Sequence, residues 1–130
     1  LTGACVVSLG EEVSGLFSNR PELSSALLAA AKEAGEPTWE LPLVSEYRDQ
    51  MKSSVADLKN ITGKKWGGAI TAALFLEEFV SKTPWAHLDI AGPSYAERQT
   101  NPVIPVGGTG CGVRTLLRYL GTMSAARGGT

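Results

Sequence analysis

The only histidine of the chain, His87, stands two residues before Asp89 in the stretch WAHLDIAG. A histidine and an aspartate could form a catalytic pair with a nucleophile, or serve as two ligands of a metal ion. In a strand, residues two apart point to the same face, so both would share a face with Trp85. The sequence holds no second histidine and no HExxH motif. We therefore expect a structural role for the pair. The segment DIAGPS is expected to border a ligand site, because ligands bind at the carboxyl ends of strands in open α/β sheets.

Two glycine-rich segments precede predicted helices. In GGTGCG (residues 107–112), backbone N–H groups could hold an anion. The context of a dinucleotide fingerprint is missing, so we interpret it as a tight entry to the last helix, with a nucleotide site as the alternative. The segment NITGKKWGG (residues 60–68) lacks the GxxxxGK[ST] pattern of a phosphate loop. It either binds a carboxylate or a substrate backbone, or is a solvated loop.

Other polar residues form no recognisable catalytic group. Glu11 and Glu12 are adjacent, as are Glu77 and Glu78. Side chains of neighbouring helical residues do not face each other, so we interpret both pairs as surface charges. The residues themselves thus predict binding loops without a complete catalytic set.

The elements that must position these residues alternate between helix and strand along the chain, which predicts an α/β protein. We expect a three-layer α/β/α arrangement, in which a partial mixed sheet is flanked by helices. The apolar spacing of Val113, Leu116, Leu117 and Leu120 marks the last helix. Predicted helices cover residues 2–10, 21–34, 45–53, 67–82 and 112–123, and predicted strands or extended pieces cover residues 13–19, 38–43 and 85–92.

Composition limits the class of protein. The 130 residues suffice for one modest domain, and 43% hydrophobic with 19% charged residues indicates a packed core. A net charge of -1 gives no reason to expect binding to nucleic acid or to an anionic membrane. The apolar runs are too short to span a bilayer. Cys5 and Cys111 lie far apart without a CxxC pattern, so we expect buried thiols in a reducing, cytoplasmic compartment.

Three stretches together resemble one known family. LTGACVVSLG, ADLKNITGKKWGGAITAALFLEEFV and WAHLDIAGPS occur here in the order and spacing seen in the leucyl aminopeptidase (cytosol aminopeptidase) family of two-metal peptidases. The resemblance runs from Leu1 to about Leu120. Residue 1 opens directly into apolar and small residues, which also suggests a cut through a larger domain. We therefore expect residues 1–130 to be the C-terminal portion of that family's catalytic domain.

The resemblance implies where the chemistry lies. In that family a lysine, three aspartates and a glutamate hold two divalent ions, manganese or zinc, and all of these ligands stand upstream of the residues found here. The resemblance thus assigns no catalytic residue and no metal ligand to this chain. It places the bicarbonate that acts as base in the family near Leu1. It implies a substrate-binding role for Leu1, Thr2, Gly3, Asn60, Ile61, Ala91 and Gly92.

The implied function is that of a fragment of a two-metal leucyl aminopeptidase, which removes N-terminal residues, leucine favoured, from peptides. The complete enzyme would be a homohexamer. The 130-residue chain is expected to be inactive alone, because it would supply only pocket walls and main-chain contacts. The alternative is a stand-alone, non-catalytic module for binding or assembly.

Overall fold

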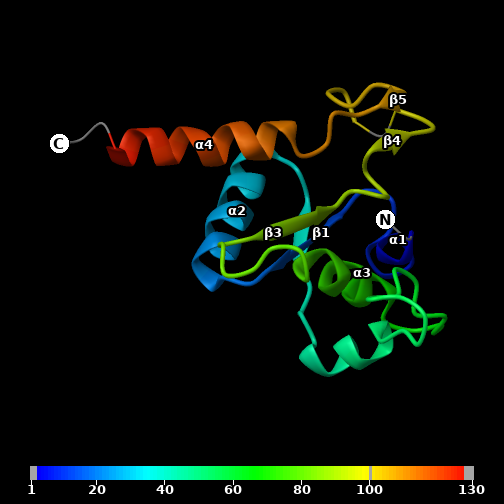
Figure 1. The fold of residues 1–130 in the computed structure, drawn as a ribbon. Coiled ribbons are helices and arrows are strands. Elements are labelled where there is room, and N and C mark those ends of the chain that lie inside the picture. Colours follow the sequence, from blue (N-terminus) through cyan, green and yellow to red (C-terminus); the bar gives the residue numbers. More distant parts are fainter. Residues whose placement is uncertain (1–2, 100, 128–130) are drawn as a thin grey trace.

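The structure is a computed structural model that describes residues 3–99 and 101–127. Helices and strands alternate along most of the chain (Figure 1). The helices are α1 (Ala4–Leu9), α2 (Pro21–Ala34), α3 (Gly68–Glu77), α4 (Val113–Arg127) and the 3-10 helix η1 (Ser45–Met51). The strands are β1 (Ser14–Ser18), β2 (Thr38–Glu40), β3 (Ala86–Asp89), β4 (Tyr95–Ala96) and β5 (Gly107–Gly108).

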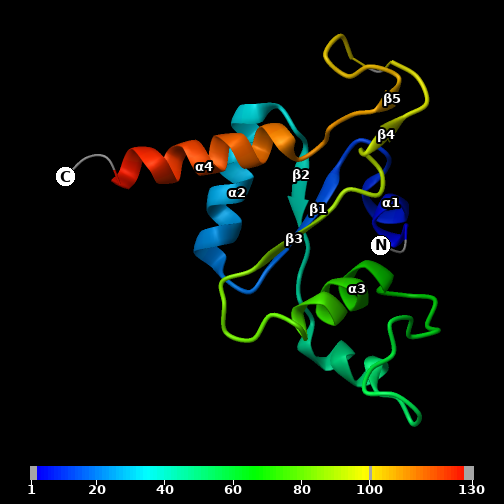
Figure 2. The ribbon, with the colours of Figure 1, turned by 45° about the horizontal axis from the view of Figure 1, so that its top comes forward.

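The main sheet is mixed and has the strand order β2-β1-β3 (Figure 2). Strands β1 and β2 run parallel, with Ser14 opposite Thr38. Strands β1 and β3 run antiparallel, with Phe17 opposite His87. Strands β4 and β5 form a separate antiparallel pair in the long segment before α4. The predicted mixed sheet is therefore confirmed, and the long loop contains a small hairpin of its own.

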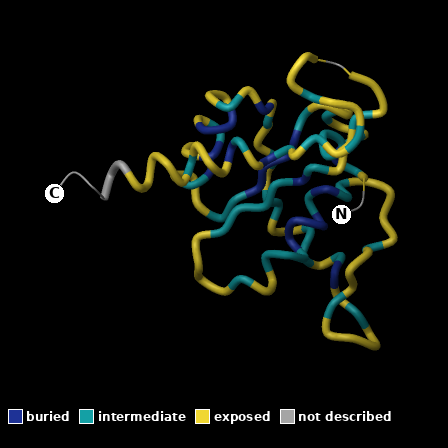
Figure 3. Tube along the Cα trace, turned by 90° about the horizontal axis from the view of Figure 1, so that it is seen from above, coloured by how far each residue is buried: buried dark blue, intermediate teal, exposed yellow. Residues whose placement is uncertain are grey.

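Helices cover both faces of the main sheet, as predicted for a three-layer α/β/α arrangement. On one face, Phe17 packs in a core with Cys5 of α1 and with Ala69 and Ala73 of α3. Leu16, the neighbour of Phe17, points to the opposite face, where α2 contacts both β1 and β2. Figure 3 shows the buried residues gathered around the sheet and its helices, while many loop residues and residues 121–124 of α4 are exposed.

Local sequence signals explain the first two helices. Helix α1 ends at Gly10, which has a positive φ of 78° and donates its N–H to the carbonyl of Val6 at 2.8 Å. Helix α2 begins with Pro21 in its first turn and ends at Gly35, whose φ is 67°. Leu27 and Ala30, three positions apart, lie on its buried face. Both helices lie close to their predicted boundaries.

Helix α4 forms where predicted, but its apolar face is turned to solvent. Thr115 is buried against the body of the chain, and α4 packs on α2 (Figure 1). The opposite side carries five exposed apolar side chains: Val113, Leu116, Leu117, Leu120 and Met123. The spacing thus predicted the helix correctly, while the side that contacts α2 is the more polar one. None of the described helices is long and apolar enough to cross a membrane.

Candidate functional site

The turn that follows β3 is fixed by hydrogen bonds between residues close in sequence. The N–H of Ala91 donates to Oδ1 of Asp89 at 3.1 Å. The N–H of Ser94 donates to the carbonyl of Ile90 at 3.0 Å. Ala91 at the tip is exposed, whereas Gly92 is half-buried. This turn, residues 90–94, therefore presents Ala91 on a defined backbone.

Gly92 brings the turn into close contact with the end of α1. A Cβ atom added at Gly92 would lie 2.7 Å from the carbonyl oxygen of Gly10 and 3.0 Å from Cα of Glu11. Both neighbours are backbone atoms, which cannot rotate away. Only glycine fits at this position, so the turn and α1 approach each other more closely than any other residue would permit.

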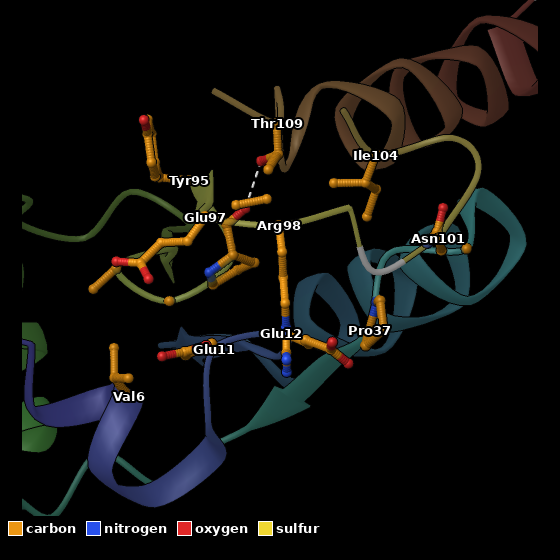
Figure 4. A pocket seen from close by; sticks show the side chains of 15 residues that line it. Val6, Glu11, Glu12, Pro37, Tyr95, Glu97, Arg98, Asn101, Ile104 and Thr109 are labelled. Carbon is orange, nitrogen blue, oxygen red and sulfur yellow. Dashed lines mark hydrogen bonds between the residues drawn. The ribbon is translucent and has the colours of Figure 1, made fainter. Parts of the chain in front are cut away.

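A groove of about 570 Å³ opens beside this turn (Figure 4). Its walls come from the turn, from α1 and the residues after it, from the connection between α2 and β2, and from residues of the segments 95–98 and 101–109. Three carboxylate side chains and one guanidinium line it, and Arg98 points toward Glu12 in Figure 4. The mixture of apolar walls and a few polar groups suits a peptide-like ligand. Val6, Pro37, Ala91, Gly92 and Thr109 are among the residues that line it.

The segment before α4 supports the turn from the other side. Thr109 donates its N–H to the carbonyl of Ser94 at 3.1 Å, and its hydroxyl to the carbonyl of Pro93 at 2.5 Å. Thr109 thus ties β5 and the entry of α4 to the turn.

The entry of α4 holds an anion, and that anion is a carboxylate of the same chain. Glu36, which is 6% exposed, accepts hydrogen bonds from the N–H groups of Gly112 at 3.2 Å and Thr115 at 2.9 Å. The hydroxyl of Thr115 donates to it at 2.5 Å, and Nε of Arg114 lies 3.4 Å away. Glu36 therefore occupies the N–H of Gly112 at the end of GGTGCG. The N–H groups of Thr109 and Cys111 donate to other groups of the chain, so these donors are taken where a nucleotide phosphate would need them.

The pKa of Glu36 is consistent with these hydrogen bonds. Burial alone raises the pKa of Glu36, but the hydrogen bonds from Thr115 and Gly112 and the nearby Arg114 outweigh it, so its pKa lies below the usual value. The sequence did not reveal this role of Glu36, because a single glutamate between Gly35 and Pro37 has no periodic signal. The one available hint was the glycine-rich helix entry itself.

His87 and Asp89 lie on one face of β3, as predicted. The ring of His87 stacks on Phe17 and Trp85, with centroids 5.9 Å and 6.3 Å apart. Within residues 3–99 and 101–127, Nε2 of His87 and Oδ2 of Asp89 are buried without a hydrogen-bond partner. Those same residues contain no group of three His, Cys, Asp or Glu side chains that could hold a metal ion. The packing of His87 between aromatic rings supports the structural role expected for it.

Burial lowers the pKa of His87, and the nearby Asp89 only partly offsets this effect. The folded chain therefore prefers neutral histidine more than the unfolded chain does. As pH falls below about 6.5, the unfolded state binds a proton more readily, so the free energy of unfolding should decrease.

We expect unfolding in urea to show this loss between pH 7.5 and pH 5.5, and the loss should shrink in His87→Gln. Because His87 is the only histidine, its ring signals in an NMR titration give its pKa directly. A midpoint at or above 6.5 would contradict the expectation.

The structure places the residues assigned to substrate binding in two groups. Leu1 and Thr2 lie outside the described residues. Ala91 and Gly92 line the groove. Asn60 and Ile61 are exposed in the loop before α3 and do not line it.

Helix α1 lies between these two groups. Gly3 precedes α1, and a Cβ atom added at Gly68 would lie 2.9 Å from Cβ of Ala4. The start of α1 thus lies against the start of α3, which directly follows the loop that carries Asn60 and Ile61. The other end of α1 lies against Gly92. The described residues do not show Ile61 in contact with Ala91. The lining residues Val6, Pro37 and Thr109 had no signal in the sequence, since they meet only through the fold.

Comparisons with known proteins agree over most of the chain. The family model described as "Cytosol aminopeptidase family, catalytic domain" matches residues 1–117. A protein of a Picosynechococcus species described as "Probable cytosol aminopeptidase" is 51% identical over 120 residues, which are 92% of this chain and 24% of the relative. A protein of Thermosynechococcus vestitus with the same description is 52% identical over 125 residues, which are 96% of this chain and 25% of the relative.

Solved structures agree with these sequence matches. The bottromycin maturation enzyme BotP in complex with Mn is 43% identical with a TM-score of 0.90, over 95% of this chain and 27% of that chain. A mutant of tomato leucine aminopeptidase is 41% identical with a TM-score of 0.83, over 92% of this chain and 23% of that chain. The chain thus spans about a quarter of the length of the relatives it matches. It belongs to the cytosol aminopeptidase family, and most of its described residues lie within the match to that family's catalytic domain.

Proposed function

We propose that this chain forms part of the substrate site of a two-metal aminopeptidase, which removes N-terminal residues, leucine favoured, from peptides. The observation that carries the proposal is the turn 90–94, where Ala91 and Gly92 line a groove and are held by α1, β3 and Thr109. The same turn lies within the stretch matched by the family model. In this proposal residues 1–130 are the C-terminal portion of the catalytic domain.

The roles proposed for individual residues are those of walls and main-chain partners. Ala91 and Gly92 border the substrate side chain. Asn60 and Ile61 form a second edge of the substrate pocket, with one polar and one apolar side chain. Leu1, Thr2 and Gly3 offer backbone groups to the peptide, with bicarbonate near Leu1. The proposal gives this chain no catalytic residue.

The described residues do not fit a metal centre, because no three ligand side chains are grouped among them. We therefore place the ligands of both metal ions in the part of a complete enzyme that lies outside the match. The similar BotP structure is a complex with Mn, which supports manganese over zinc. A homohexamer and a cytoplasmic location are further parts of the proposal, and the description of the relatives as cytosol aminopeptidases supports the location.

The test uses two proteins and one substrate, leucine p-nitroanilide. One is this chain alone, and the other is a chimera, in which this chain replaces its matching residues in the Thermosynechococcus vestitus relative. The chain alone should show no turnover with Mn²⁺ or Zn²⁺. The chimera should hydrolyse the anilide within about tenfold of its parent, lose activity with a chelator and regain it with Mn²⁺.

Hydrolysis by the chain alone at rates near those of the parent would contradict the proposal. A folded chimera without activity would contradict it as well, because the chain would then fail to supply the pocket walls.

A second candidate, a stand-alone binding or assembly module, is favoured by the exposed apolar face of α4. Leu117 is 67% exposed and Leu120 is 58% exposed. An exposed apolar stripe of this kind marks an association site. Stable self-association of the chain in size-exclusion chromatography, together with an inactive chimera, would favour this function over the first.

A further inference from the structure

We propose that Asp89 is a positioning residue of the substrate site: its buried carboxylate fixes the turn 90–94 and thereby the place of Ala91. This inference rests on the proposed function, since it needs Ala91 to border the substrate. It adds a role for a residue that is not among those that line the groove.

The contact that carries the inference joins a side chain to the backbone two residues on. Asp89 is 2% exposed and is the last residue of β3. Its Oδ1 accepts the N–H of Ala91 at 3.1 Å. An aspartate bonded in this way mimics a backbone turn and determines the direction in which the chain leaves the strand. The side chain of Asp89 therefore contributes directly to the direction of Ala91.

The backbone of Asp89 is held in the sheet beside β1. It lies opposite Gly15 in the antiparallel ladder of β1 and β3. A Cβ atom added at Gly15 would lie 2.6 Å from Sγ of Cys5 and 3.7 Å from Cβ of Asp89. The missing side chain at Gly15 thus makes room for Cys5 of α1, while Asp89 lies at an ordinary packing distance. Asp89 is therefore packed beside the contact between β1 and α1.

The second carboxylate oxygen gives a reason to look for a role beyond packing. Among the described residues, Oδ2 of Asp89 is buried and has no partner. A buried polar atom without a hydrogen bond destabilises the folded state, so packing alone would favour another residue here. This cost is explained if the carboxylate is retained because its Oδ1 holds the turn.

The same geometry supplies a matched pair of variants. Asp89→Asn keeps a carbonyl oxygen that can accept the N–H of Ala91, while it replaces the oxygen that has no partner by an amide nitrogen and removes the negative charge. Asp89→Ala removes the acceptor. The other hydrogen bonds and contacts of the turn, from Ser94, Thr109 and Gly92, remain in both variants.

Two measurements test the inference. In the 130-residue chain, hydrogen exchange at the amide of Ala91 should speed up about tenfold or more in Asp89→Ala and stay near the original rate in Asp89→Asn. In the chimera, Asp89→Ala should raise KM for leucine p-nitroanilide about tenfold and change kcat less than about threefold. Asp89→Asn should restore KM.

The outcomes separate the two proposals. Unchanged exchange at Ala91 in Asp89→Ala would overturn the positioning role, whether or not the chimera is active. Equal losses of kcat and stability in both variants, with no specific rise in KM, would also overturn it, because a general structural role predicts that result. The parent chimera could be inactive while exchange at Ala91 is faster in Asp89→Ala and unchanged in Asp89→Asn. That result would contradict the proposed function and support the positioning of Ala91 by Asp89.

Discussion

Gly92→Ala should lower the free energy of unfolding by about 1–3 kcal/mol, because the new methyl group has no space. It would lie 2.7 Å from the carbonyl oxygen of Gly10 and 3.0 Å from Cα of Glu11. Neither atom can move without shifting the end of α1 or the turn 90–94. The substitution therefore separates two elements that the fold brings into direct contact.

Gly108→Ala is the matched control for this substitution. A Cβ atom added at Gly108 meets nothing within 4 Å, and neither glycine has a positive φ. Both substitutions restrict the unfolded chain equally, so their difference isolates the clash at Gly92. Urea unfolding measures both. Equal stability of the two variants would show that α1 and the turn are not in close contact.

Glu36→Ala should be at least as damaging, with a loss of about 2–4 kcal/mol in the free energy of unfolding. The carboxylate accepts three hydrogen bonds from Gly112 and Thr115 and lies beside Arg114. Removal of Glu36 leaves the buried N–H groups at the start of α4 without partners. Because α4 begins shortly after Thr109, the loss should also loosen the support of the turn.

The pH dependence of this effect has a defined sign. The pKa of Glu36 in the folded chain lies below the usual glutamate value of 4.5. The ionised carboxylate of Glu36 therefore adds its full contribution to the free energy of unfolding above pH 4.5. This contribution is lost as pH falls through the lower pKa of the folded chain. Urea unfolding at pH 7 and at pH 3 should show a large gap between the original chain and Glu36→Gln at the higher pH and a smaller gap at the lower one.

Glu33→Ala is the control from helix α2, three residues before Glu36. Glu33 is exposed and lies 3.7 Å from Nε of Arg118. An exposed ion pair of this kind contributes at most about 1 kcal/mol. If Glu33→Ala destabilised the chain as much as Glu36→Ala, the importance assigned to the buried carboxylate would be wrong.

Much of the fold could be predicted because its signals are local. Gly10, Pro21 and Gly35 mark helix ends by their backbone preferences, and the chain follows them. The alternation around His87 placed it correctly on the same face as Trp85, where both rings stack. Signals of this kind act over a few residues and survive in almost any tertiary context.

The rest depends on contacts between distant residues. Glu36 meets Thr115, which is 79 positions away, and nothing near Glu36 in the sequence indicates this. The spacing of Leu116 and Leu120 predicted a helix face but not which side would meet α2. Ala91 and Gly92 were found through the family resemblance, whereas their neighbours Val6 and Thr109 emerge only from the fold.

The most direct test of the proposed substrate site is the selectivity of the chimera after Ala91→Leu, measured as kcat/KM for leucine and alanine p-nitroanilides. If Ala91 borders the substrate side chain, the larger leucine side chain fills the space beside it. The value for the leucine anilide should then fall about tenfold or more, with a smaller fall for the alanine anilide. Unchanged values for both substrates, in a variant as stable as its parent, would contradict the claim that this turn forms a wall of the substrate site.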